Sequence, residues 1–135
     1  MQTTVLIADD NANVRDAWRR LLSTMPDVLV IAEACDGDDA VRLAVKHRPS
    51  VVLMDVSMPR MNGFEATRRI RRDAVGVRVI IVSADATPDF VEVGFEAGAA
   101  GYVAKAAAHE ELPRAFTALA RGERFSTPVA TPRQA

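Results

Sequence analysis

The sequence predicts an α/β domain in which five helices cover both faces of a parallel, five-stranded sheet. Short apolar runs alternate five times with longer segments whose apolar residues recur every three or four positions, which indicates strands alternating with helices. The central runs are apolar throughout, as is typical of parallel strands buried on both faces. Right-handed crossovers leave few strand orders, and we favour the doubly wound, flavodoxin-like order 2-1-3-4-5.

The first two strands follow from apolar runs with clear ends. Residues 4–8 form a run that stops at two aspartates, and Asn11 can then cap a helix that Pro26 terminates. Residues 28–32 give the second strand. We place this strand at an edge of the sheet because a charged residue, Glu33, follows it directly.

The middle of the chain supplies the strand that we expect to be most buried. A helix over about residues 38–46 is closed by Pro49, and the four apolar residues 51–54 then form the third strand. Turn-forming residues follow, and a third helix begins near Asn62. A run with no polar member is expected in the centre of the sheet.

The last third of the chain adds two strands and two helices. Residues 77–82 form a nearly all-apolar fourth strand, and Thr87 can cap a helix that begins with proline and ends at Gly98. Residues 101–104 give the fifth strand. Apolar residues recurring along about residues 110–121 give the fifth helix.

Size and composition describe one globular domain without a strong electrostatic preference. The chain has 135 residues and a formal net charge of −1, which argues against general attraction to nucleic acid or anionic membranes. It has no leader-like start and no apolar run near the roughly 18 residues of a membrane span, so we expect a cytoplasmic protein without membrane contact. The single cysteine, Cys35, is expected to fill a small apolar space at a strand end.

Polar side chains stand at the carboxyl ends of four of the five predicted strands. They are Asp9 and Asp10 after the first, Asp55 after the third, Ser83 after the fourth and Lys105 after the fifth. These ends share one edge of the sheet, so three carboxylates converge there and repel one another unless a cation or proton intervenes. Taken singly, each residue has an ordinary structural explanation. Asp9 and Asp10 could cap a helix, Asp55 and Ser83 could be turn residues, and Lys105 could be an exposed loop lysine. Their joint occurrence favours a site for a partly hydrated Mg²⁺.

Taken together, the residues up to Lys105 make the chain resemble the receiver domain of bacterial two-component response regulators. The similarity spans nearly the whole chain. It rests on Asp9-Asp10, on residues 55–59 with Asn62-Gly63, on Ser83-Ala84, and on residues 98–102 leading to Lys105.

The end of the chain is similar to a narrower group. Residues 120–123 followed by 125–128 resemble the NarL/FixJ regulators, whose receiver precedes a LuxR-type helix-turn-helix DNA-binding domain. We therefore expect a receiver domain over residues 1–123 and a linker-like tail over 124–135, with the DNA-binding domain absent from this chain.

The resemblance implies a phosphorylation-activated switch. Asp55 would accept a phosphoryl group from a sensor histidine kinase or a small phosphodonor in a Mg²⁺-dependent reaction. The implied metal ligands are Asp10, Asp55 and the carbonyl of Ser57, with Asp9 acting mostly through water. The protein would not be an enzyme in the ordinary sense, although it would catalyse its own phosphorylation and a slow autodephosphorylation.

The resemblance also implies how the signal is read. Lys105 and Ser83 would contact the phosphoryl oxygens, Ala84 would leave access open, and Tyr102 would turn toward the space that Ser83 vacates. The surface of the fourth helix, fifth strand and fifth helix would then change to control a transcriptional output. Homodimerisation on phosphorylation is one further implied interaction, and DNA would be bound only through the absent domain.

Two departures from the commonest receiver pattern concern the loops around the site. Ala106 follows Lys105 where many receivers have a proline, so the geometry of this loop is left open. Ser57 and Asp85 flank the site on two loops. We expect them to tune the rate of dephosphorylation, without assigning a direction.

Three other functions compete with this one. A flavin or dinucleotide site needs a glycine- or hydroxyl-rich loop after the first strand, and Asp9-Asp10-Asn11 presents the wrong charge there. A phosphatase with an aspartate nucleophile would have a second acid two residues after the first, where Asn11 stands. A stand-alone or phosphorylation-independent receiver that acts only through protein contacts remains the alternative.

Overall fold

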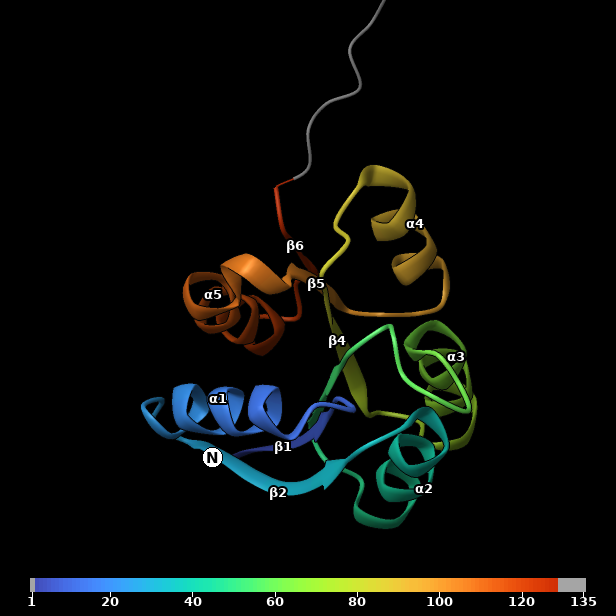
Figure 1. Ribbon diagram of the computed structural model, residues 1–135. Coiled ribbons are helices and arrows are strands. Elements are labelled where there is room, and N and C mark those ends of the chain that lie inside the picture. The colour runs from blue at the N-terminus through green and yellow to red at the C-terminus, as the bar shows by residue number, and fades with distance from the viewer. Residues whose placement is uncertain (1, 129–135) are drawn as a thin grey trace, which may run out of the picture.

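The chain folds into a six-stranded parallel sheet with the order β2-β1-β3-β4-β5-β6, flanked by helices (Figure 1). This computed structural model describes residues 2–128. Its strands are β1 (Thr3–Ala8), β2 (Val28–Ala34), β3 (Val51–Met54), β4 (Arg78–Ser83), β5 (Gly101–Ala104) and β6 (Phe125–Ser126). Its helices are α1 (Ala12–Ser23), α2 (Gly37–His47), α3 (Gly63–Asp73), α4 (Pro88–Glu96), the 3₁₀ turn η1 (Lys105–Ala107) and α5 (Ala108–Ala120).

Two apolar cores cover the two faces of the sheet. Successive side chains of a strand point to opposite faces, and in β1 Val5 and Ile7 join the core under α1 and α5, whereas Leu6 and Ala8 join the core under α2, α3 and α4. Figure 1 shows the same division, with α1 and α5 together on one side of the sheet. Burial on both faces explains why the central strands are apolar throughout.

The strand order 2-1-3-4-5 and the five helices are confirmed, and β6 is an addition. Phe125 and Ser126 pair in parallel with Gly101 and Tyr102 of β5. The Thr127 N–H then donates to the Tyr102 carbonyl at 2.7 Å. A two-residue strand has no sequence period, so composition alone marked this segment as linker. Residues 129–135 of the expected tail lie outside the described residues.

The expectation for Cys35, which follows β2, is wrong, and the second helix begins one residue earlier than expected. Cys35 is exposed and fills no apolar space, because β2 extends to Ala34 and the chain leaves the sheet immediately afterwards. Gly37 belongs to a helix, since the Asp36 carboxylate caps α2 by accepting from the Asp39 N–H at 2.8 Å. Glu33 lies within β2, and this strand is the sheet edge that its charge predicted.

Within residues 2–128, no helix is both long enough and apolar enough to cross a lipid bilayer. The longest helix, α5, has 13 residues.

The start of α3 packs against the backbone of Asp55 and Val56, at the sheet edge where the predicted polar residues lie. Gly63 is the first residue of this helix, and its N–H donates to the Val56 carbonyl at 2.9 Å. A Cβ on Gly63 would lie 2.1 Å from the backbone oxygen of Asp55. Because neither partner in this contact is a flexible side chain, a larger residue would push the loop after β3 away from the helix.

Replacing Gly63 by alanine should therefore destabilise the fold. We expect Gly63→Ala to lower the free energy of unfolding by about 2–3 kcal/mol, as overpacking typically does. Gly101→Ala is the control, because its Cβ would lie 3.3 Å from Ile80 Cγ1, which can move. Urea denaturation measures both, and equal losses for the two variants would contradict the close-contact explanation.

Candidate functional site

Backbone hydrogen bonds of the sheet place Asp9 and Asp55 side by side at its carboxyl edge. Asp9 directly follows β1, and its N–H donates to the Ala34 carbonyl of β2 at 3.1 Å. Asp55 directly follows β3, and its N–H donates to the Ala8 carbonyl of β1 at 2.9 Å. Both bonds continue the ladder one step beyond the strands. Their side chains consequently leave the sheet from neighbouring strands at the same edge.

A pocket of about 350 Å³ opens at this edge. Asp9 is fully buried in it, Asp55 is 4% exposed, and Asp10 is exposed at its rim. The three residues each offer a carboxylate oxygen, and these atoms lie within 4.8 Å of one another. The lining residues are Asp9, Asp10, Asn11, Val14, Asp55, Val56, Ser57, Ser83, Ala84, Asp85, Phe90 and Lys105.

Lys105 supplies the cation that faces these acids. Its Nζ lies 3.0 Å from Asp9 Oδ2 and 3.4 Å from Asp55 Oδ1. Lys105 opens the 3₁₀ turn η1, so the loop that contains Ala106 is a short helical turn, and the described residues have no cis peptide bond. One ammonium group therefore stands against two buried carboxylates and a third at the rim.

The titration of the pocket reflects this imbalance. Burial, and then the charge of Asp9, raises the pKa of Asp55 to about 6, although Lys105 works in the opposite direction. Burial also opposes the charged form of Lys105, but the close contact with Asp9 and the charges of Asp55 and Asp9 outweigh this effect and raise the pKa of Lys105. The two buried carboxylates thus favour additional positive charge in the pocket.

The donor atoms suit a hard divalent cation. Asp9 Oδ1 accepts from the Asn11 N–H at 2.8 Å, whereas Asp9 Oδ2 is buried and has the Lys105 ion pair but no directed hydrogen bond. Carboxylate oxygens near an open pocket are the ligand type of Mg²⁺, which keeps several of its waters. Asp9, Asp10 and Asp55 could therefore hold such a metal, and Ser57 lines the same pocket.

The loop after β4 brings Ser83, Ala84 and Asp85 to the opposite side of the pocket. The Ser83 hydroxyl oxygen accepts from the Asp85 N–H at 3.0 Å. A hydroxyl also carries one donor, so the Ser83 O–H can donate to a further group. Ala84 is exposed at the mouth, where its small side chain blocks nothing.

Tyr102 is the one predicted site residue that does not line the pocket. It is fully buried in the core under α2, α3 and α4. Its hydroxyl donates to the Asp85 carbonyl at 2.6 Å, and burial raises its pKa. Tyr102 therefore contacts the site through the loop after β4, at the Asp85 carbonyl.

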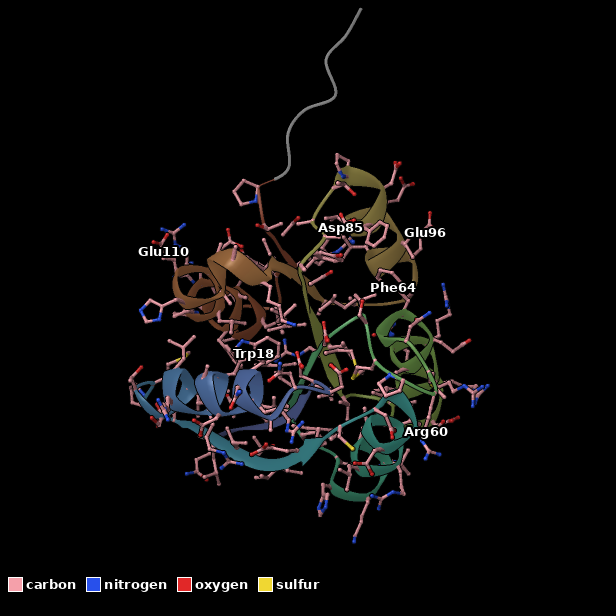
Figure 2. All side chains as sticks on the ribbon, in the orientation of Figure 1. Trp18, Arg60, Phe64, Asp85, Glu96 and Glu110 are labelled. Carbon is pink, nitrogen blue, oxygen red and sulfur yellow. The ribbon has the colours of Figure 1, made fainter. Side chains whose placement is uncertain are left out.

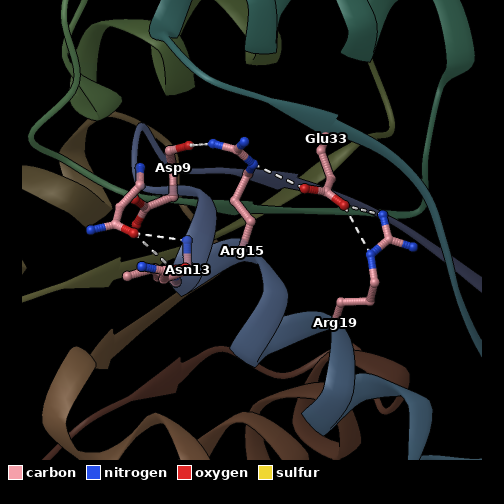
Figure 3. A network of polar contacts seen from close by, with 7 residues as sticks. Asp9, Asn13, Arg15, Arg19 and Glu33 are labelled. Atoms are coloured by element: carbon pink, nitrogen blue, oxygen red, sulfur yellow. Dashed lines mark hydrogen bonds and ion pairs between the residues drawn. The ribbon is translucent and has the colours of Figure 1, made fainter.

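A network on α1 that sequence reasoning missed holds the backbone of Asp9 (Figure 3). The Arg15 guanidinium donates to the Asp9 carbonyl at 2.6 Å and to Glu33 at 2.9 Å. Arg19 donates to the same carboxylate at 2.9 Å, and its hydrogen bond is the main cause of the lowered pKa of Glu33. The available signal was Glu33 itself, a charge inside an apolar strand, which sequence reasoning used only to place the strand at an edge.

Two aromatic residues near the pocket were also missed as neighbours of the site. Phe90 of α4 is 39% exposed and lines the pocket, and its ring meets Phe64 of α3 edge to face at 6.1 Å. Trp18 of α1 is buried in the core, yet Lys105 Nζ lies 5.7 Å from the centroid of its ring. Helical spacing predicts which face is buried, but it does not show which distant residue meets that face.

Known proteins resemble this chain in sequence and in fold. Residues 5–117 match the response regulator receiver domain family. The transcriptional regulatory protein YxjL of Bacillus subtilis, itself described as uncharacterized, is 40% identical over 119 residues, which make up 88% of this chain and 55% of that protein. The chain thus spans about half the length of this curated relative.

Two solved structures superpose closely. A two-component response regulator of the LuxR family from Aurantimonas sp. gives a TM-score of 0.90 at 37% identity and covers 95% of this chain and 91% of its own. The isolated receiver domain of RcsB from Salmonella enterica serovar Typhimurium, solved with the phosphomimetic BeF₃⁻, gives 0.86 at 26% identity over 94% of each chain. Family match, relatives and fold agree: the chain belongs to the response regulator receiver domain family of two-component systems, and its relatives include regulators of the LuxR type.

Proposed function

We propose that this receiver stores a phosphoryl group on Asp55 and that a sensor histidine kinase is the physiological donor. The observation that carries the proposal is the pocket itself, in which the buried Asp55 carboxylate lies beside Asp9, Asp10 and the Lys105 ammonium. Phosphoryl transfer needs positioning and charge neutralisation more than covalent assistance. This pocket offers both.

Each residue has a definite part in the transfer. An Asp55 oxygen attacks phosphorus while the bond from phosphorus to the donor nitrogen or oxygen breaks, and the leaving group carries away that electron pair. A Mg²⁺ ion bound by Asp10, Asp55 and the Ser57 carbonyl, with Asp9 acting through water, would neutralise charge on the phosphoryl oxygens. Lys105 would pair with a further oxygen.

The proposed switch follows from the loop after β4. A phosphoryl group brings about −1.5 to −2 charge and three acceptor oxygens, and the O–H of Ser83 can donate to one of them. Movement of Ser83 would disturb the Asp85 N–H that it holds, and Asp85 is hydrogen-bonded to Tyr102. We propose that the surface of α4, β5 and α5 changes as a result.

The output and partners are proposed from the relatives. The LuxR-family neighbour favours a transcriptional output through a DNA-binding domain, and RcsB, a solved relative, is described as dimers bound to DNA. We therefore propose a homodimer on phosphorylation and DNA contact through such a domain. Absence of any phosphoryl-dependent change would instead favour a receiver that acts only through protein contacts.

The phosphoacceptor role can be tested with Mg²⁺ and acetyl phosphate or BeF₃⁻. We expect a phosphoryl adduct on phosphate-affinity gels in the wild type, and none after Asp55→Asn or after metal removal with EDTA, because the nucleophile or the neutralising cation is then missing. Emission from Trp18, the only tryptophan, should report BeF₃⁻ binding, since Lys105 lies 5.7 Å from its ring.

The control for this experiment is Asp38→Asn, which removes an exposed acid from α2. It should form the adduct like the wild type. An equal adduct in Asp55→Asn would refute the assignment of Asp55, and no adduct in the wild type would refute the phosphoryl-storing function.

The raised pKa of Asp55 also predicts a pH-dependent stability in the metal-free protein. Between its ordinary value of 3.8 and about 6, folded Asp55 holds a proton that the unfolded chain releases, so the free energy of unfolding falls as pH rises. Asp55→Asn removes this unfavourable charge. At pH 7 the variant should be about 1–3 kcal/mol more stable than the wild type, and this gain should vanish below about pH 4.

Thermal unfolding of metal-free protein across this pH range measures the effect. The free energy of unfolding of Asp38→Asn, relative to the wild type, should not show this dependence on pH. A gain for Asp55→Asn that is the same at acid and neutral pH would contradict the charge-based explanation.

Ser57 and Asp85 are proposed to set the lifetime of the aspartyl phosphate. Both line the pocket, on the loops after β3 and β4, where they can admit or exclude the attacking water. Ser57→Ala and Asp85→Ala should each change the dephosphorylation rate after excess donor is removed, with Asp38→Ala as control. Rates equal to that of the wild type in both variants would contradict this role.

A further inference from the structure

Lys105 has two kinds of neighbour. Its ammonium forms ion pairs with Asp9 and Asp55 at 3.0 and 3.4 Å, and it also lies 5.7 Å from the centroid of the Trp18 ring. A cation within about 6 Å of an aromatic face is attracted by the ring quadrupole, and tryptophan is the best partner of this kind. The carboxylates and the ring therefore act together on one flexible side chain.

The ring of Trp18 is a fixed feature of the core. It is 5% exposed, and it belongs to the apolar cluster that also contains Ala108 and Leu112 from the start of α5. Figure 2 shows Trp18 in the space between α1 and α5. Side chains packed in this way hold their positions, so the place of the ring does not depend on what the pocket contains.

The carboxylate partners, by contrast, change with occupancy. Under the proposed function, on which this step rests, Asp9 and Asp55 face a cation and Asp55 gains a phosphoryl group, so their charge is no longer available to Lys105 alone. Lysine has a compact ammonium on a flexible four-carbon stem, and without a fixed contact it would sample many positions. Trp18 is the neighbour whose interaction with Lys105 persists.

We propose that Trp18 is a positioning residue for Lys105. The face of the Trp18 indole keeps the Lys105 ammonium at the acidic pocket, both before and after the pocket is occupied. The residue touches no reacting atom. It acts by restricting where the ammonium can be when the phosphoryl group arrives, which makes Lys105 effective in charge neutralisation.

The contact itself is tested in metal-free protein, independently of phosphorylation. Protons on Lys105 Cε should show an upfield ring-current shift by NMR in the wild type. The shift should be smaller in Trp18→Phe, which keeps an aromatic face, and absent in Trp18→Leu. An unchanged shift in Trp18→Leu would overturn the proposal.

The consequence is tested by the rate of adduct formation from acetyl phosphate with Mg²⁺. Loss of a cation–π contact should slow Trp18→Leu by about three- to tenfold, and Trp18→Phe should recover part of the rate. Phe116→Leu is the matched control, because it replaces a buried aromatic residue of the same cluster on α5. It should react at nearly the wild-type rate.

The possible results separate the two proposals. Equal slowing in Trp18→Leu and Phe116→Leu would show a packing effect and would overturn the positioning role, as would a wild-type rate in Trp18→Leu. Both results presuppose an adduct in the wild type. If the wild type forms no Asp55-dependent adduct, the proposed function fails first.

Discussion

The burial of neighbouring, mutually repelling carboxylates at one edge of the sheet is the constraint that the rest of the structure must satisfy. Asp9 and Asp55 are both buried, and a single ammonium from Lys105 faces them. Such an arrangement is unfavourable in isolation, as the raised pKa of Asp55 shows. It persists because the surrounding backbone fixes both aspartates, and the ladder bonds from Asp9 to Ala34 and from Asp55 to Ala8 are part of the sheet itself. The stable core thereby holds a locally unstable group of charges.

Supports outside the sheet act on the same residues. Arg15 binds the Asp9 carbonyl and is itself held by Glu33 of β2, so α1, β1 and β2 meet at this point. On the other side, the start of α3 contacts the Asp55 carbonyl so closely that only glycine fits at position 63. Both contacts are made to backbone atoms. They leave the carboxylate oxygens free for the pocket, which is what a site that must accept a ligand requires.

The sequence predicted the parts of this structure that depend on local periodicity and on strand ends. The acids and Lys105 could be placed because each follows a recognisable apolar strand, and parallel strands share one edge. Trp18 beside Lys105, and Arg15 beside Glu33, could not be placed, because helical spacing shows only that a side chain faces inward or outward. The strand β6 was missed for a related reason: two residues carry no period, and their pairing with β5 depends on where α5 ends.

Tyr102 connects the pocket with β6 at the far edge of the sheet. Its hydroxyl donates to Asp85 beside the pocket, and its carbonyl accepts from Thr127 after β6. Its ring has no free space on the side of α4, since a Cβ on Gly94 would lie 2.7 Å from it. Closely packed interiors do not absorb displacements by compression. A shift of Asp85 that moves this side chain must therefore be accommodated by α4 or by β5 with its partner β6.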